Sequence, residues 1–114
     1  MSTTETILAT AKRTLLSESK SIETLVNYLD DDFAKSVTEI YNTKGRLVVT
    51  GIGKSALIAQ KIVATLNSTG TPSMFLHAAE AVHGDLGMVQ PEDIIICISK
   101  SGNSPEIKVL APLL

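Results

Sequence analysis

The sequence predicts an α/β fold, with a parallel sheet flanked by helices and preceded by N-terminal helices. The apolar runs at 46–50 and 94–98 have the length and β-branched content of buried strands, and 73–77 has the length of a second short strand. Segments with helical spacing, 56–67 and 78–83, separate them, and each run is followed by a turn rich in glycine or hydroxyl residues. This alternation implies parallel strands joined by right-handed crossovers. We therefore divide the chain into an N-terminal helical segment, 1–45, and an α/β domain, 46–114.

Length and composition exclude several classes of protein. The chain has 114 residues, enough for one small domain, and its 44% apolar and 19% charged content supports a packed core. A net charge of −2 and the absence of Trp give no case for nucleic acid. One cysteine excludes an internal disulfide, and no run approaches the ~18 apolar residues of a membrane span. We expect a cytoplasmic protein with no membrane or nucleic-acid partner.

Two helices are predicted before the first strand. Ser2-x-x-Glu5 fits a capping box, and an apolar stripe continues from Leu8 to Leu29, so one long helix should end near Asp30. The stripe could pack on a partner subunit or on its own domain. The acidic run 30–32 suits the start of the second helix, which Gly45 should follow as a left-handed cap.

Ligands of parallel sheets bind at the carboxyl ends of the strands. Three segments of unusual composition occupy these positions: 51–55, 77–83 and 99–106. Three strands make a thin parallel sheet, and the chain stops inside or just after the helix that should follow the third strand. We expect that the sheet is incomplete in this chain, as in a truncated or fragmentary domain.

The segment 99–106 is predicted to bind a small anion such as phosphate. Its hydroxyl residues Ser99, Ser101 and Ser104 lie in a strand-to-helix turn, where backbone N–H groups favour anions. Pro105 suits the first helical position and Ser104 the N-cap. Glu106 then places a carboxylate close to any bound ligand.

The Gly-Ile-Gly-Lys-Ser turn at 51–55 resembles two phosphate motifs. A Walker A loop is excluded because Val48 stands where a glycine is required. A relaxed dinucleotide fingerprint is satisfied, but His77 stands where an acidic residue is expected, so a nicotinamide cofactor is the weaker alternative. Lys54 could neutralise an anion or a developing oxyanion, or be a solvated surface lysine.

His77 and His83 are the only histidines. Six residues apart, they do not form a helical metal pair, and each could be structural or functional. His83 could act as an acid or base near neutral pH. Cys97 lies inside an apolar run and is interpreted as a small buried hydrophobe rather than a catalytic thiol.

Taken together, the motifs resemble a known family. The segments 51–55, 68–72, 80–89 and 99–106 occur in the order and spacing of arabinose 5-phosphate isomerases, members of the sugar isomerase (SIS) domain superfamily. The match is close over 46–114, and Ala-Val-His-Gly-Asp-Leu-Gly at 81–87 is its most particular part. The resemblance implies a Rossmann-like SIS domain.

The resemblance also implies an activity, the interconversion of D-ribulose 5-phosphate and D-arabinose 5-phosphate through an enediol. The product would feed the synthesis of 3-deoxy-D-manno-octulosonate (KDO) and lipopolysaccharide. It implies no required cofactor and homotetramers whose sites draw on more than one subunit. It also implies a further catalytic histidine downstream, which this chain lacks. Non-catalytic phosphosugar-sensing SIS modules remain the main alternative.

The expected site residues combine the turn chemistry with the resemblance. By similarity, His77 matches a position that can ligate a non-essential zinc ion, either inhibitory or adventitious. We expect Glu106 to act as the base, His83 to assist ring opening or oxygen proton transfer, and Lys54 to stabilise the oxyanion. Substrate binding is expected at Gly53, Ser55, Gly70, Thr71, His83, Ser99, Ser101 and Ser104.

Overall fold

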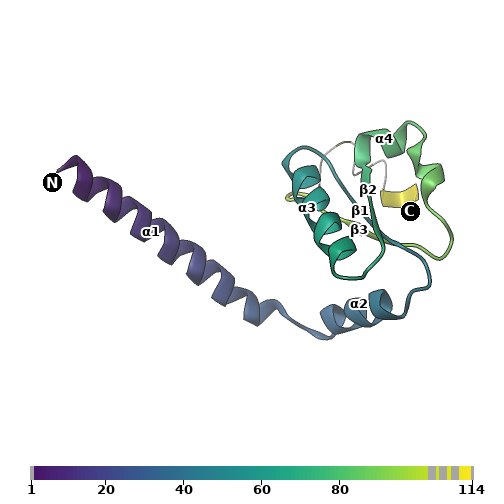
Figure 1. Ribbon diagram of the computed structural model, residues 1–114, viewed down its shortest axis with the longest axis horizontal. Helices are drawn as coiled ribbons and strands as arrows, with labels where there is room; N and C mark the ends of the chain where they lie inside the picture. The colour runs from purple at the N-terminus through teal and green to yellow at the C-terminus, as the bar shows by residue number, and fades with distance from the viewer. Residues whose placement is uncertain (1, 103–104, 106–107, 109–110, 114) are drawn as a thin grey trace. The chain divides into compact units, whose positions relative to one another are not determined.

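The computed structural model describes residues 2–102, 105, 108 and 111–113. The chain parts into two compact units, Met1–Thr38 and Glu39–Leu114, which we describe separately. Helix α1 (Thr3–Thr24) continues into the 3-10 turn η1 (Leu25–Tyr28), and helix α2 (Asp31–Asn42) follows (Figure 1).

Local sequence signals explain where the N-terminal helices begin. The capping box is confirmed, because Ser2 Oγ accepts from the Glu5 N–H at 3.0 Å and Glu5 Oε2 accepts from the Ser2 N–H at 2.9 Å. Asp30 Oδ1 accepts from the Phe33 N–H at 3.0 Å and so caps α2. The first helix ends earlier than predicted, because its last turn, Leu25–Tyr28, is 3-10 rather than α-helical.

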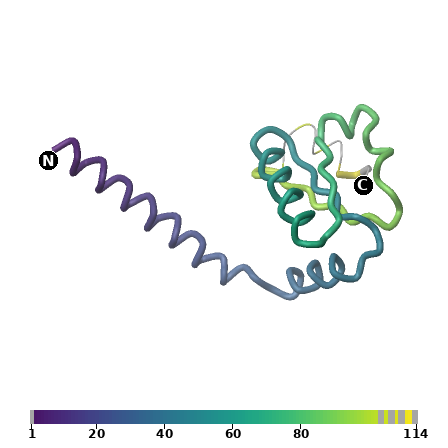
Figure 2. Tube along the Cα trace, viewed as in Figure 1, coloured from purple at the N-terminus to yellow at the C-terminus, as the bar shows by residue number. Residues whose placement is uncertain are grey.

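The second unit is built on a parallel three-stranded sheet, as the alternation of apolar and helical segments predicts (Figures 1 and 2). Strands β1 (Leu47–Gly51), β2 (Ser73–His77) and β3 (Ile94–Cys97) lie in the order β2-β1-β3. The central strand β1 is buried along its whole length. The register pairs Gly51 with His77 and Thr50 with Cys97.

Helices cover the two faces of the sheet because successive residues of β1 point to opposite sides. Leu47 and Val49 pack with Ala59 of helix α3 (Lys54–Ser68). Val48 packs with Leu76 and with helix α4 (Ala78–Val82), and Leu86 of the 3-10 turn η2 (Asp85–Met88) joins this second cluster. A last 3-10 turn, η3, spans Ala111–Leu113. No helix in the described part of the chain is long and apolar enough to cross a membrane.

The turn before β3 is joined to the start of β1. The Asp93 carboxylate accepts from the backbone N–H groups of Arg46 and Gln90, each at 2.8 Å, and pairs with the Arg46 guanidinium at 3.3 Å. These donors, the backbone groups first, hold the pKa of Asp93 below its ordinary value. The network ties two segments that lie 47 residues apart in the sequence.

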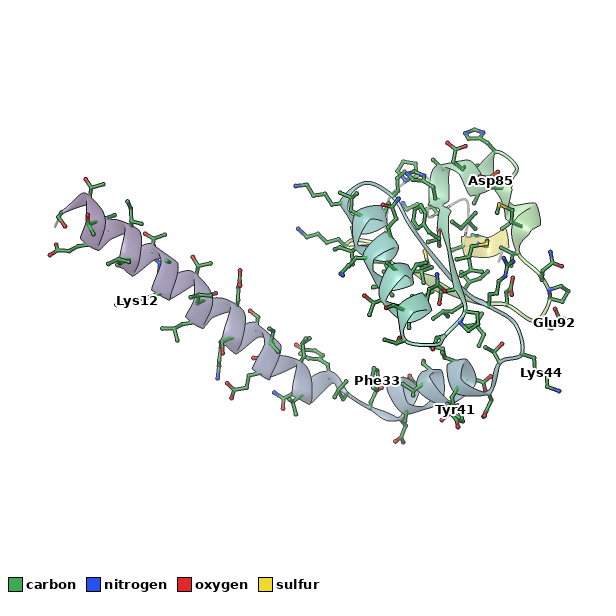
Figure 3. All side chains as sticks on the ribbon, in the orientation of Figure 1. Lys12, Phe33, Tyr41, Lys44, Asp85 and Glu92 are labelled. Atoms are coloured by element: carbon green, nitrogen blue, oxygen red, sulfur yellow. The ribbon has the colours of Figure 1, made fainter. Side chains whose placement is uncertain are left out.

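Gly45 does not have the left-handed conformation that was predicted for it. The glycines with positive φ in the described residues are Gly53, Gly70, Gly84 and Gly102. A glycine is needed at position 45 for a different reason: the backbone of Glu92 and Asp93 lies so close that a Cβ there would collide with it. Figure 3 labels Lys44 and Glu92, on the two segments that meet.

Candidate functional site

The carboxyl ends of the three strands lie side by side. Gly51 pairs with His77 at the end of β2, and the Ile98 N–H donates to the Thr50 carbonyl at 2.9 Å just beyond β3. The segments leaving β1, β2 and β3 therefore start from one edge of the sheet. These are the three segments that the sequence singles out.

The strand order places a topological switch point at this end of the sheet, and we call this position the crevice. The connection from β1 to β2 runs through α3 on one face, while the connection from β2 to β3 runs through α4 and η2 on the other face. The first connection leads from β1 to β2 on one side of it, and the second leads back past β1 to β3 on its other side. The position between β1 and β3 is therefore a switch point, which is where open α/β sheets bind ligands. The turn after β1 and the loop after β3 form its two walls.

The turn after β1 leaves the N-terminus of α3 open. Gly53 has φ 61° and ψ −132°, and no atom of the described residues lies within 4 Å of where its Cβ would be. Among the described residues no side chain caps α3, and Lys54 and Ser55 lie in its first turn, Lys54 exposed and Ser55 half-buried. A helix N-terminus with an adjacent lysine attracts anions.

Gly51 lets this turn approach the neighbouring strand. A Cβ at Gly51 would lie 3.2 Å from the Ile98 carbonyl oxygen and 3.1 Å from the backbone of Ser55. The glycine therefore lets the first turn of α3 and the residue after β3 both approach the end of β1. Ser55 and Ser99 thus lie on segments that pass beside Gly51.

The described part of the second wall, 99–102, is a compact turn. Ser99 Oγ accepts from the Gly102 N–H at 2.8 Å, and Gly102 has φ 71°. The Ser99 hydroxyl proton remains available to donate, since this bond uses an oxygen lone pair. Ser101 is exposed on the same turn. Ser104 and Glu106 lie outside the described residues.

His77 and His83 lie at the two ends of α4. His77 is half-buried, and its Nδ1 accepts from the Ala79 N–H at 3.2 Å as the N-cap. His83 is exposed at the C-cap, about 9 Å further along the helix. Asp85 follows on η2 (Figure 3). No cluster of three His, Cys, Asp or Glu residues suited to a metal ion occurs among the described residues.

Gly70 and Thr71 lie at the opposite end of the strands from the crevice, near the amino end of β1. They follow the end of α3, where Gly70 has φ 97° and the Thr71 N–H donates to the Leu66 carbonyl. The next residue, Pro72, accepts from the Leu47 N–H at the start of β1. The length of β1 separates the two edges by about 13 Å. Within one chain the structure does not bring this pair to the other predicted site residues.

The prediction that Cys97 is buried is wrong. Cys97 is exposed, because β3 is an edge strand in this chain. Partial desolvation raises the pKa of its thiol, which argues against a thiolate nucleophile.

Thr50 is a residue that sequence reasoning passed over. It is fully buried at the end of β1, and its Oγ1 has no hydrogen-bond partner in the described structure. A signal was present, because Thr50 is the polar residue in an otherwise apolar strand.

Comparisons with known proteins agree with this architecture. The SIS domain family model matches residues 39–114. Arabinose 5-phosphate isomerase GutQ of Shigella flexneri is 46% identical over 110 residues, covering 96% of this chain and 34% of the relative. Arabinose 5-phosphate isomerase KdsD of Pseudomonas aeruginosa is 46% identical over 104 residues, covering 91% and 32%. The chain thus spans about a third of the length of these curated relatives.

Solved structures match the whole described fold. The structure of Escherichia coli CFT073 c3406 in complex with arabinose 5-phosphate is 41% identical with a TM-score of 0.89, covering 99% of this chain and 60% of that one. A candidate sugar-phosphate isomerase from Listeria monocytogenes is 37% identical with a TM-score of 0.89, covering 98% and 59%. With the family model matching well over half of the sequence, this chain belongs to the SIS domain family.

Proposed function

We propose that the chain is part of an arabinose 5-phosphate isomerase, which interconverts D-ribulose 5-phosphate and D-arabinose 5-phosphate. The observation that carries the proposal is the switch point, where the first turn of α3, with Lys54, and the serine turn that begins at Ser99 leave the sheet from the carboxyl ends of the neighbouring strands β1 and β3. An anion site on these two walls suits the phosphate of a small sugar. The similarity to GutQ, KdsD and c3406 supports this choice of sugar.

The chemistry requires proton transfer between C1 and C2 through an enediol. A base must take the carbon proton, a second group must move protons on oxygen, and a cation must stabilise the developing oxyanion. We assign the base to Glu106, oxygen proton transfer to His83 and oxyanion stabilisation to Lys54. The phosphate would be held by Gly53, Ser55 and the serines at 99, 101 and 104.

The proposal extends to the assembly and the setting of the enzyme. Gly70 and Thr71 lie at the far edge of the sheet, so in a homotetramer they would contact the substrate of a neighbouring subunit. No cofactor would be required, with zinc at most an inhibitory or adventitious ligand. The enzyme would act in the cytoplasm, and its product would feed KDO and lipopolysaccharide synthesis.

The test is to incubate the intact protein with ribulose 5-phosphate and to measure arabinose 5-phosphate. Glu106→Gln should lower kcat by about 10²–10⁴-fold, as expected for the loss of a general base. Glu92→Gln is the matched control, because Glu92 is exposed near the start of β3, at the opposite edge from the crevice (Figure 3). Lys54→Gln should likewise lower kcat, and Lys44→Gln is its matched control, because both lysines are exposed and Lys44 precedes β1.

The outcomes separate the alternatives. Substantial turnover by Glu106→Gln would remove Glu106 as the base. Phosphosugar binding without any turnover by the wild-type protein would favour a sensing module. Tight NAD binding without phosphosugar binding would favour a dinucleotide domain.

A further inference from the structure

The His77 side chain has a defined role at the start of α4. Its Nδ1 accepts the Ala79 N–H at 3.2 Å, and its ring meets Phe75 edge-on, with ring centroids 6.1 Å apart. The ring is half-buried, and these two contacts fix its orientation. A neutral imidazole whose Nδ1 accepts a hydrogen bond carries its proton on Nε2.

Helix α4 depends on such contacts. It has five residues, too few to be stable alone, and it is held by the burial of Ala78 and Ala81 against Val48 and Leu76. The His77 cap satisfies the Ala79 N–H, which has no partner inside the helix. His83 follows directly as the C-cap. The placement of His83 is therefore set by a helix that His77 begins.

The cap and metal ligation through His77 exclude each other. A metal ion on Nδ1 would displace the Ala79 N–H directly. A metal ion on Nε2 would need the lone pair there and the proton on Nδ1, which could then no longer accept. The described residues also include no cluster of three metal-ligating side chains. They therefore do not fit a resident zinc site that uses His77.

We propose that His77 is a positioning residue, whose Nδ1 caps α4 and thereby fixes the short helix that ends at His83. The inference rests on the proposed function, because it assigns His83 to the reaction. It predicts that the essential property of the side chain at 77 is an acceptor at the Nδ1 position. The rest of the imidazole, including Nε2, is dispensable for turnover.

The test compares His77→Asn, His77→Gln and His77→Ala in the intact protein. The Asn amide oxygen replaces Nδ1, whereas the Gln oxygen lies one methylene further out, near the place of Nε2. Hydrogen exchange at the Ala79 amide reports the cap without reference to activity. Exchange should be about fivefold or more faster in the Ala and Gln variants, as expected for a lost N-cap, and within about twofold of wild type in the Asn variant.

Turnover should follow the same order. We expect kcat to fall at least about fivefold in His77→Ala and His77→Gln, with KM changing less, because a misplaced group slows chemistry more than binding. His77→Asn should restore kcat to within about twofold of wild type. An inactive Asn variant with a protected Ala79 amide would overturn the proposal, because His77 would then act through Nε2.

The wild-type protein offers a second measurement that needs no variant. Imidazole ¹⁵N shifts should identify Nε2 as the protonated nitrogen of His77 and Nδ1 as the acceptor. Protonated Nδ1 in the neutral ring would overturn the cap. If the wild-type protein has no isomerase activity, the proposed function fails, while the exchange and ¹⁵N results still decide whether His77 caps α4.

Discussion

Replacing Gly45 with alanine should destabilise the α/β unit, because the new Cβ would enter the backbone of the turn before β3. The ideal Cβ lies 2.5 Å from the Glu92 carbonyl carbon and 2.8 Å from the Asp93 nitrogen. Ordinary contact begins at 3.4 Å, so one backbone must move by about 1 Å.

That movement would disturb the hydrogen bonds that join the two segments. Thr43 Oγ1 donates to the Glu92 carbonyl at 2.9 Å, and the Arg46 N–H donates to Asp93 Oδ1 at 2.8 Å. Overpacking costs about 1–3 kcal/mol, and each weakened bond adds up to about 1 kcal/mol. We therefore expect Gly45→Ala to lower the free energy of unfolding by about 2–4 kcal/mol.

Urea denaturation followed by far-UV circular dichroism would measure the loss. Gly87→Ala is the matched control, since Gly87 has no positive φ and no atom of the described part of the chain lies within 4 Å of an added Cβ, and it should stay within about 0.5 kcal/mol of wild type. Gly45→Asn distinguishes the two explanations of this glycine, because asparagine tolerates a left-handed conformation but not a collision. An Asn variant as stable as wild type would refute the close-approach reasoning.

Three further predictions concern the core, the crevice and the acid response of the protein. Leu76→Ala removes a side chain that is 2% exposed in the Val48 cluster, and should cost about 2–5 kcal/mol in the same denaturation experiment. Gly53→Ala should cost about 1–3 kcal/mol through backbone strain at φ 61°, and should weaken inorganic phosphate binding measured by calorimetry; unchanged stability would contradict the left-handed geometry. The pKa of Asp93 is lowered from 3.8 in the folded state, so its contribution to stability is complete well above pH 3.8 and is lost as pH falls through the lower folded pKa. Stability measured between pH 5 and about pH 2 should therefore fall less steeply in Asp93→Asn than in wild type, and parallel curves would contradict this assignment.

Much of the candidate site could be predicted because its signals are local. A glycine-rich turn after an apolar run, followed by a helical segment, indicates an anion site at a strand end whatever the rest of the fold does. Lys54, Ser55 and Ser99 were predicted in this way, and in the structure they lie on the segments that leave the carboxyl ends of β1 and β3. The placement of Gly70 and Thr71 was missed, because similarity names residues without saying on which edge of the sheet they lie.

Short patterns in the sequence were enough to predict the start of the first helix, the three strands and the α/β class, whereas the third helix begins at Lys54 rather than at the predicted Ala56. The Ser2–Glu5 capping box and the strand at Ser73–His77 depend on residues at most a few positions apart, so short patterns predict them. The strand order β2-β1-β3 became known only from the packed fold, and with it the exposure of Cys97 and the position of the switch point. It also decided that Gly45 meets Glu92 and that His77 presents Nδ1 to Ala79. These features depend on which distant segments become neighbours and how a ring is oriented among them, and neither has a period or spacing in the chain.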